Sequence, residues 1–517
     1  MAAAQTTGLG VFLEEIVQLK WRLLIFGCIL TFGSYYIYDF PGSIGMGHDG
    51  SIEAFFYKKG KVYTNIMNQS LYSVYSWPNT VLAIFGGLLI DKYLGLRKAM
   101  LLFCSLVFLG SVLFYIGVLT TDYALMIVGR VCFGLGGESL SVSQSSLTSR
   151  WFRGGRGMAL AMGITVSFSR VGSSVNFFLS PVIAEKDVPT AALLGVFACL
   201  LSLVSCLIII AIDVYGTRKG VVPPENKDAN STMNIREALL LPRNFWFISL
   251  ICVSIYCAIF PFTGVAKIFF EQKFNIDGPT ASSYTALYQI SSAAGSPVVG
   301  FVVDNIGRFT YFMGASSLCF ALVHVVFLCS KAPAFVMMPV MGVVYSFMVS
   351  SLWPSVAYAV PGTLVGMGYG VMTAMQNTGL AIYPLIVGQV LDMHTPPMPT
   401  NGPGNCSERE LPPNVPSWAP GSRVNCTNST APLPTIEGFN ITLLMFMGAA
   451  LCGLVFAVCL YISDSKATGG MLAGTPDERK AKMILLDGEK AALLAAQTKA
   501  EDATDAAAVN KSASDIG

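Results

Sequence analysis

The chain has 517 residues, of which 53% are hydrophobic and 12% are charged, and its formal net charge is +2. Soluble domains carry about 25% charged residues, so a chain with half that share is expected to fold in an apolar solvent. The small net charge provides no basic face for nucleic acid. The cysteines and histidines are not spaced as metal ligands, so we expect neither a metal nor another cofactor.

Twelve apolar runs of membrane-spanning length follow one another along the chain. A helix needs about 20 apolar residues to cross a bilayer, and lipid offers no partner to free backbone groups, so the runs predict helices. The first six are 23–39, 68–90, 99–119, 123–147, 158–183 and 191–214. The last six are 245–265, 282–303, 311–328, 334–360, 364–391 and 441–462.

These runs predict an all-α membrane protein with two six-helix halves. The expected segments are a cytoplasmic N-terminus (1–22), a first half (23–214), a cytoplasmic linker (215–244), a second half (245–462) with a lumenal loop (395–437), and a disordered cytoplasmic tail (463–517). Basic residues gather in short loops on the cytoplasmic side of membrane proteins. Arg97 and Arg150 fall on the same side as the linker, so both termini are predicted to be cytoplasmic.

A pattern of glycine, aspartate and arginine recurs between spans two and three and between spans eight and nine. Glycine lets two helices approach closely, and the arginine can form an ion pair with the aspartate across the turn. Two copies at equivalent places indicate a duplicated six-helix unit. The pattern resembles the loop signature of the major facilitator superfamily, which implies alternating-access transport with a cytoplasmic latch. The implied gating residues are Asp91, Arg97, Asp304 and Arg308.

Two opposite charges fall near the middle of predicted spans, Glu138 in span four and Arg170 in span five. An unpaired ion costs several kcal/mol there, so such residues face a wet cavity, pair with each other, or both. One interpretation is a structural ion pair between the two spans. The other is a polarised site for a zwitterion, which the neighbouring polar residues Gln144 and Asn176 favour.

Six sequence blocks resemble the lysosomal dipeptide uniporters of the same superfamily. They lie on spans one, two, four, five, seven and eleven, at residues 35–41, 75–79, 136–140, 170–176, 260–267 and 376–382. The resemblance implies transport of dipeptides out of the lysosome and places Glu138 and Arg170 in the substrate site. It also implies a single-pass, heavily glycosylated accessory membrane protein as a partner within the lipid bilayer.

The chemistry of a dipeptide suits these charges, because every dipeptide carries one ammonium and one carboxylate group. Arg170 is expected to hold the carboxylate as a planar fork, and Glu138 or Asp39 to hold the ammonium. Lys267 either steers the substrate or extends its ammonium to the membrane surface. The other candidate substrate-binding residues, each of which could instead serve packing, are Tyr38, Tyr75, Trp77, Asn176, Tyr256, Tyr288, Trp353, Gln376 and Asn377.

The predicted lumenal loop and the tail carry further signals. The loop contains glycosylation sequons at Asn405, Asn425 and Asn428, and a possible disulfide between Cys406 and Cys426. Glycans on this loop would protect the lumenal face from proteases; the alternative is an inert insertion. In the tail, Glu489, Leu493 and Leu494 match an acidic-dileucine sorting pattern, which favours a lysosomal or endosomal membrane over the plasma membrane.

Two other functions stay open at the level of sequence. The first is a proton-coupled carrier of another small organic anion, such as a monocarboxylate, with Arg170 as the anion ligand and Glu138 as the proton switch. The second is a receptor or assembly subunit that transports nothing. An enzyme is not expected, because the sequence holds no nucleophile–base set and no phosphate-binding loop.

Overall fold

The computed structural model describes residues 18–47, 50–88, 94–152, 158–222, 241–361, 364–396, 433–479 and 481–482, and within them every regular element is a helix. Residues 18–30 form a helix that leads into the first labelled element. The helices that follow are α2 (Phe32–Tyr38), α3 (Phe40–Ile44), α4 (Ile52–Lys58), α5 (Asn65–Leu88), α6 (Leu96–Thr120), α7 (Tyr123–Phe152), α8 (Met158–Ala184), α9 (Val188–Arg218), α10 (Arg243–Phe274), α11 (Gly278–Ile306), α12 (Phe309–Cys329), α13 (Ala334–Ala359), α14 (Val365–Met393) and α15 (Ile436–Ala467).

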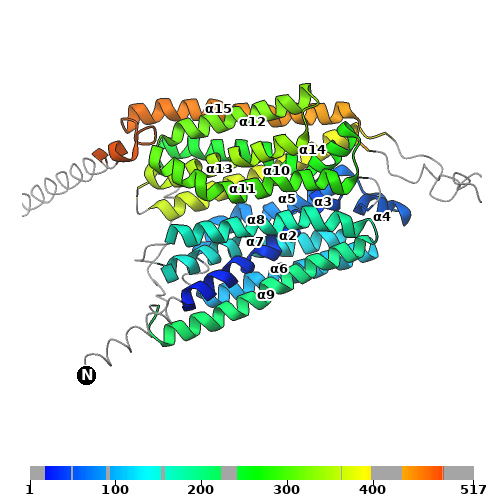
Figure 1. Cartoon of the computed structure of the whole chain (residues 1–517), viewed down its shortest axis with the longest axis horizontal. Helices are drawn as coiled ribbons and strands as arrows, with labels where there is room; N and C mark the ends of the chain where they lie inside the picture. The colour runs from blue at the N-terminus through cyan, green and yellow to red at the C-terminus, as the bar shows by residue number, and fades with distance from the viewer. Residues whose placement is uncertain are drawn as a thin grey trace, which may run out of the picture.

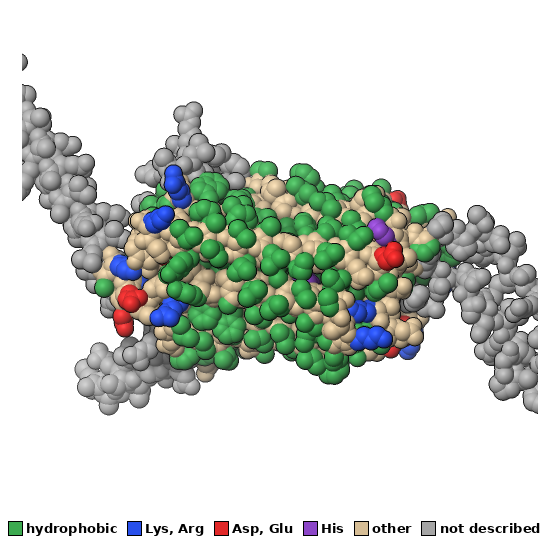
Figure 2. Space-filling view, turned by 90° about the horizontal axis from the view of Figure 1, so that it is seen from above, with side chains coloured by type: hydrophobic (Ala, Val, Ile, Leu, Met, Phe, Trp, Pro, Cys, Tyr) green, Lys and Arg blue, Asp and Glu red, His purple; other side chains and the backbone are tan. Residues whose placement is uncertain are grey.

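Eight of the described helices are long and apolar enough to cross a membrane, namely α6, α7, α9, α10, α11, α12, α13 and α15. Helices α5, α8 and α14, with 24, 27 and 29 residues, also exceed the length of about 20 residues that a bilayer requires. A broad hydrophobic belt covers the middle of the molecule, and charged side chains gather at its two ends (Figure 2). The chain is therefore a multi-pass membrane protein; the count of twelve spans and the side of the termini stay predictions.

The helices form two groups that lie side by side, α2–α9 in one and α10–α15 in the other (Figure 1). Across the boundary between the groups, α5 packs along α14 and α8 packs along α11. We call the end of the bundle where α9 ends and α10 begins the linker end. We call the opposite end, which carries α4, the α4 end. We call the first group the first half and the second group the second half.

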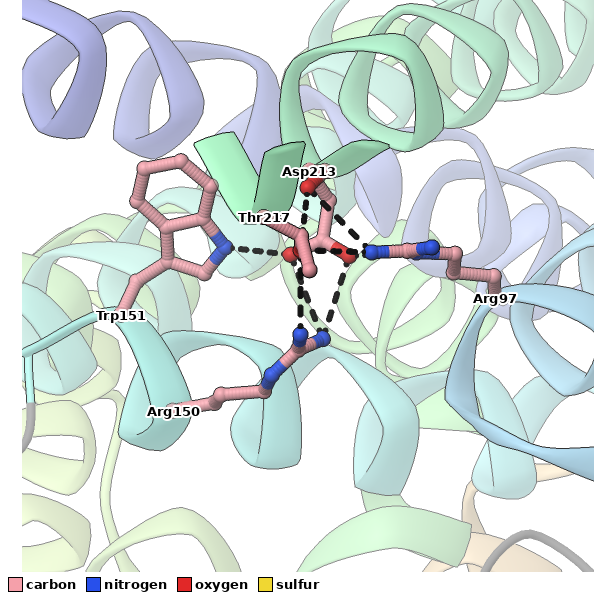
Figure 3. Close-up of polar contacts among 5 residues, drawn as sticks. All are labelled: Arg97, Arg150, Trp151, Asp213 and Thr217. Atoms are coloured by element: carbon pink, nitrogen blue, oxygen red, sulfur yellow. Dashed lines mark hydrogen bonds and ion pairs between the residues drawn. The ribbon is translucent and has the colours of Figure 1, made fainter. Parts of the chain in front are cut away.

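A buried carboxylate, Asp213, ties the first half together at the linker end (Figure 3). Its oxygens accept hydrogen bonds from Arg97 Nε at 2.6 Å, Arg150 Nη1 at 3.1 Å and Trp151 Nε1 at 2.6 Å. These donors come from α6 and α7, whereas Asp213 lies on α9. A buried carboxylate is tolerated when several donors satisfy it, so this network joins three helices into one unit. The predicted gating residue Arg97 is thus engaged inside its own half.

The second half has a corresponding carboxylate, Asp464, near the end of α15, and it is also fully buried. It accepts hydrogen bonds from the backbone N–H groups of Leu472 at 2.9 Å and Ala473 at 3.1 Å, and from Thr468 Oγ1 at 2.6 Å. These bonds turn the chain back against the bundle after α15. The sequence predicted a disordered tail from residue 463, whereas residues 468–479 are folded onto the second half.

Arg479 anchors this returning segment. Its guanidinium lies 4.0 Å from the ring centre of Phe309 and 4.6 Å from that of Tyr358, and its Nε donates to the carbonyl of Met471 at 3.2 Å. Gly307 allows the close approach, because a Cβ there would lie 2.8 Å from the carbonyl oxygen of Gly474. The returning segment therefore covers the second copy of the loop signature.

The aspartate and arginine of the second loop signature do not pair with each other, in contrast to what the sequence predicted. Asp304 and Arg308 are both exposed, and no ion pair joins them in the described part of the chain. The Arg308 backbone N–H instead donates to the Gly474 carbonyl at 3.0 Å. The following predicted residues lie outside the described residues: Asp91, Asn405, Asn425, Asn428, Cys406, Cys426, Glu489, Leu493 and Leu494.

Replacing Arg479 by Ala is expected to destabilise the purified protein by about 2 kcal/mol, because a desolvated cation–π contact is lost and two carbonyls lose a donor. Thermal unfolding in detergent measures the effect. Arg479→Lys keeps the charge and should lose less. Arg218→Ala, which removes an exposed arginine at the same end, is the control. Equal unfolding temperatures for Arg479→Ala and Arg218→Ala would show that the returning segment does not stabilise the bundle.

Candidate functional site

The first span is broken at Asp39, between α2 and α3. Pro41 has no N–H group and cannot supply the hydrogen bond that a continuous helix would give to the carbonyl of Ile37. Arg130 of α7 donates instead, from Nη1 to the Ile37 carbonyl and from Nη2 to the Tyr38 carbonyl, both at 2.8 Å. The break thus presents Asp39 toward the second half, where it meets Gln289, and the hydrogen bonds of the buried Arg130 stabilise the break.

Arg130 itself is only 1% exposed and has no carboxylate partner in the described chain. Its guanidinium is surrounded by the rings of Tyr72, Phe114 and Phe133, at 5.5–5.6 Å from each ring centre. Cation–π contacts and three carbonyl acceptors, the third being that of Leu71, replace a counterion. Arg130 lies within the predicted span four but was not among the predicted site residues. Its position two helical turns before Glu138 was the signal that could have linked it to the site.

Glu138 lies on α7, is half-buried, and accepts no hydrogen bond from a described residue. The ring of Tyr75 packs beside it against Gly137, where a Cβ would come within 2.6 Å of the phenol oxygen. Tyr38 meets Tyr75 edge-on at 4.9 Å between ring centres. The predicted residues Glu138, Tyr75 and Tyr38 therefore come together on the inner face of the first half.

Arg170 lies on α8 and reaches across the boundary between the halves. Its Nη1 donates to Ser292 Oγ of α11, and its guanidinium carbon lies 4.7 Å from the ring centre of Tyr345 on α13. No ion pair joins Arg170 to Glu138 or to any other carboxylate in the residues that the structure describes. The structural ion pair that the sequence allowed is thus not formed in this conformation.

Aromatic residues of the second half cluster around this contact. The Tyr256 hydroxyl lies 3.4 Å from the Tyr345 hydroxyl and accepts a hydrogen bond from Trp353 Nε1 at 3.3 Å. The ring of Tyr288 lies 5.7 Å from that of Tyr345. The predicted residues Tyr256, Tyr288 and Trp353 are thus brought together. Tyr345 was missed, although a tyrosine in the middle of an apolar span was a readable signal.

Asp39 forms a second contact between the halves. Gln289 Nε2 of α11 donates to Asp39 Oδ2 at 3.3 Å, and both side chains are buried. Asp39 therefore has a neutral partner and no cation within ion-pair distance among the described residues. Together, Glu138, Asp39 and Arg170 place two negative charges and one positive charge along the inner faces of the two halves.

Other predicted site residues have different roles in this conformation. Asn176 is buried within the first half, where its Oδ1 accepts from Ser43 Oγ at 3.1 Å, and this bond joins α8 to α3. Gln376 Oε1 accepts from the Cys252 thiol at 3.7 Å, and Asn377 Nδ2 donates to a carbonyl of its own helix at 3.0 Å. Trp77 is 55% exposed and makes no ring contact with the aromatic residues above.

Comparison with known proteins identifies the family of this chain. The model of the Major Facilitator Superfamily matches residues 23–384. The chain belongs to the Major Facilitator Superfamily. It is therefore of a transporter family, as the repeated loop signature predicted.

Similar proteins include lysosomal dipeptide transporter MFSD1 of Bos taurus, which is 32% identical over 381 residues, or 72% of this chain and 79% of that protein. The Homo sapiens protein of the same name is 32% identical over 388 residues, or 72% of this chain and 81% of its own. Two solved structures of nucleoside transporter NupG, one of them of a point mutant, share the fold. Their TM-scores are 0.59 and 0.58 at 13% and 14% identity; each covers 86% of this chain, and the matches span 99% and 100% of NupG.

In this conformation the two halves are locked together at the α4 end. Asp392 of α14 accepts hydrogen bonds from the first backbone N–H groups of α5, those of Asn65 at 2.7 Å and Ile66 at 3.0 Å. A carboxylate at a helix N-terminus is stabilised by unsatisfied N–H groups and by the helix dipole. Between the Arg170–Ser292 contact and the linker end, no hydrogen bond or ion pair joins described residues of different halves.

A second lock at the α4 end involves Lys267. This predicted substrate residue is 3% exposed; its Nζ donates to the Met46 carbonyl at 3.0 Å and lies 3.4 Å from Glu271 Oε1. Glu53 of α4 is buried nearby, and its Oε2 accepts from the Gly47 N–H at 3.2 Å. Lys267 therefore serves the lock in this conformation, and its ammonium is not available to a substrate.

The charges of this second lock do not balance, because two buried carboxyl groups share one ammonium. Burial raises the pKa of Glu53 to about 8, against an ordinary value of 4.5. The Gly47 N–H and Lys267 oppose this rise, whereas Asp392 and Glu271 add to it. A proton bound by Glu53 in the folded state stabilises the fold fully below about pH 4.5, and this stabilisation is lost as the pH rises through 8.

We therefore expect the thermal stability of the purified protein to fall between pH 5 and pH 8. Glu53→Gln, which mimics the protonated carboxyl, should reduce that fall by at least about 2 °C. Glu185→Gln changes an exposed carboxyl at the same end and is the control. An identical pH dependence in Glu53→Gln and the unmodified protein would contradict a protonated Glu53 in the lock.

Proposed function

We propose that the chain is an alternating-access uniporter that carries dipeptides, or small zwitterions with the same charge pattern, out of the lysosome. One observation carries the proposal. Glu138 and Arg170 lie on neighbouring helices within the membrane, have opposite charges, and are each without a counterion in the described residues. A ligand that carries both a carboxylate and an ammonium would satisfy both charges at once.

The proposed binding mode follows from the donor and acceptor geometry of the side chains. Arg170 presents a planar fork to the carboxylate of the substrate, and Glu138 or Asp39 accepts its ammonium. Both charged groups belong to the backbone of a dipeptide, so its side chains are free to vary. The rings of Tyr38 and Tyr75 would face them from the first half, and those of Tyr256 and Tyr288 from the second.

The lock at the α4 end supports a substrate path toward the linker end in this conformation, whereas the concentration gradient sets the net direction of a uniporter. In this conformation Asp392 and Lys267 hold the halves together there, so the substrate would leave toward the linker end. Arg97 at the start of α6 and Arg150 at the end of α7 lie at the linker end, which the distribution of basic residues predicts to be cytoplasmic. A substrate that enters from the lumen would require both locks to open first.

The names of similar proteins support the choice of substrate and compartment. Proteins named lysosomal dipeptide transporter are 32% identical over 72% of this chain. An accessory glycoprotein and protective glycans on loop 395–437 belong to the same proposal.

A proton-coupled carrier of small organic anions is the second candidate. The half-buried carboxyl of Glu138 favours it, because a carboxyl without a partner is suited to take up and release a proton. In that case Arg170 alone would bind the anion. The two candidates differ in whether the substrate needs an amino group.

Arg170→Ala is expected to weaken dipeptide binding about ten- to hundredfold, because hydrogen bonds to a charged group are lost. Arg170→Lys should also fail, since a lysine has no planar fork. Ligand-dependent thermal shifts of the purified protein measure binding, and unfolding temperatures without ligand report the fold. Arg218→Ala is the control. A parallel fall of unliganded stability and binding would assign Arg170 a structural role.

Acetylation of the substrate's amino group separates the two candidates. An N-acetylated dipeptide keeps its carboxylate but loses its ammonium, so the zwitterion site should bind it at least about tenfold more weakly. Glu138→Gln should reduce this discrimination, because the neutral amide no longer attracts the ammonium. Equal binding of free and acetylated dipeptides would favour the carrier of organic anions.

A further inference from the structure

Arg170 is held by the second half through groups that carry no charge. Its guanidinium carbon lies 4.7 Å from the ring centre of Tyr345, and its Nη1 donates to Ser292 Oγ. Ser346 Oγ in turn donates to the Ser292 carbonyl at 3.1 Å, which joins α13 to α11 beside the contact. The side chain of Arg170 is buried, so the ring and the hydroxyl replace water around the guanidinium.

The ring of Tyr345 has a defined orientation. Its hydroxyl meets the Tyr256 hydroxyl at 3.4 Å, and Trp353 Nε1 donates to the same Tyr256 oxygen at 3.3 Å. The rings of Tyr256 and Tyr288 lie 6.2 Å and 5.7 Å from that of Tyr345. Three helices of the second half, α10, α11 and α13, thus fix the ring face that meets Arg170 from the first half.

A uniporter must return to its starting conformation without substrate. During that return no carboxylate accompanies Arg170, and an arginine without partners is costly in an apolar interior. An aromatic face stabilises a desolvated guanidinium without adding an opposite charge. A carboxylate of the substrate binds the guanidinium more strongly than the ring does, so the substrate can displace the ring.

We propose that Tyr345 is a positioning residue that stabilises Arg170 in the substrate-free carrier and thereby permits the empty carrier to reorient. The proposal rests on the proposed function, because it takes Arg170 as the ligand of the substrate carboxylate. Tyr345 and the substrate compete for the same guanidinium. Removing the ring therefore slows the return of the empty carrier but does not weaken substrate binding.

Two transport assays on the protein in liposomes separate these steps. Net efflux of a labelled dipeptide into dipeptide-free buffer requires the empty carrier to return. Exchange, with unlabelled dipeptide at saturating concentration outside, does not require it. Tyr345→Leu is expected to slow net efflux at least about tenfold and to leave exchange within about twofold of the unmodified protein. Its dipeptide affinity, measured by thermal shift, should be unchanged or higher.

Two variants control for other effects. Tyr345→Phe keeps the ring face and should restore net efflux. Tyr311→Leu removes an exposed tyrosine of α12 and should change neither assay. An equal loss of net efflux and exchange in Tyr345→Leu, or a Phe variant as slow as the Leu variant, would overturn the proposal for Tyr345. Absence of both activities in the unmodified protein would overturn the proposed function and this inference with it.

Discussion

The cost of burying a charge in an apolar interior is the constraint on which this structure depends. For Asp213 and Asp464 this cost is offset by several hydrogen-bond donors from their own half. For Arg130 it is offset by backbone carbonyls and ring faces, and the break in the first span supplies two of those carbonyls. Where a charge is satisfied within one half, that half is a rigid unit. Rigid halves are what rocking about a central site requires.

The charges that are not satisfied within one half lie where function is expected. Arg170 and Asp39 each have a neutral partner across the boundary between the halves, Ser292 and Gln289, and Glu138 has none among the described residues. Lys267 and Asp392 also depend on groups of the other half. The contacts of Lys267 and Asp392 lie at the α4 end and break when that end opens. The distribution of partners therefore distinguishes the side chains that maintain each half from those that change partners during transport.

How much of this was predictable depends on whether the signal lay in one stretch of sequence. The position of Glu138 and Arg170 in mid-span identified them, because charge is rare in apolar runs. The superfamily fold followed from the repeated loop signature. The lock residues Glu53 and Glu271 were not predictable, since a charge near the end of a span is ordinary. Trp77 was predicted from a sequence block, yet its side chain is 55% exposed.

The returning segment was missed for a related reason. Its composition is polar, and only the tertiary contacts of Arg479 with Phe309 and Tyr358 show that it is folded. The same holds for Tyr345, whose role depends on a guanidinium 175 positions earlier in the chain. Sequence patterns report local periodicity and burial, whereas partners across a helix bundle are set by packing.

The partners of Arg170 and Asp39 across the boundary are uncharged, and this property favours one type of transport. A protein carboxylate fixed beside Arg170 would bind the guanidinium about as strongly as the carboxylate of the substrate does. A tightly binding substrate, or protonation of that carboxylate, would then be needed to release the arginine. Tyr345 and Ser292 compete weakly, as does Gln289 beside Asp39. A substrate can displace such partners, and they can take its place when it leaves. Weak, uncharged competitors on both sides of the proposed zwitterion site thus suit the proposed uniporter, which would move its substrate down a gradient and return empty.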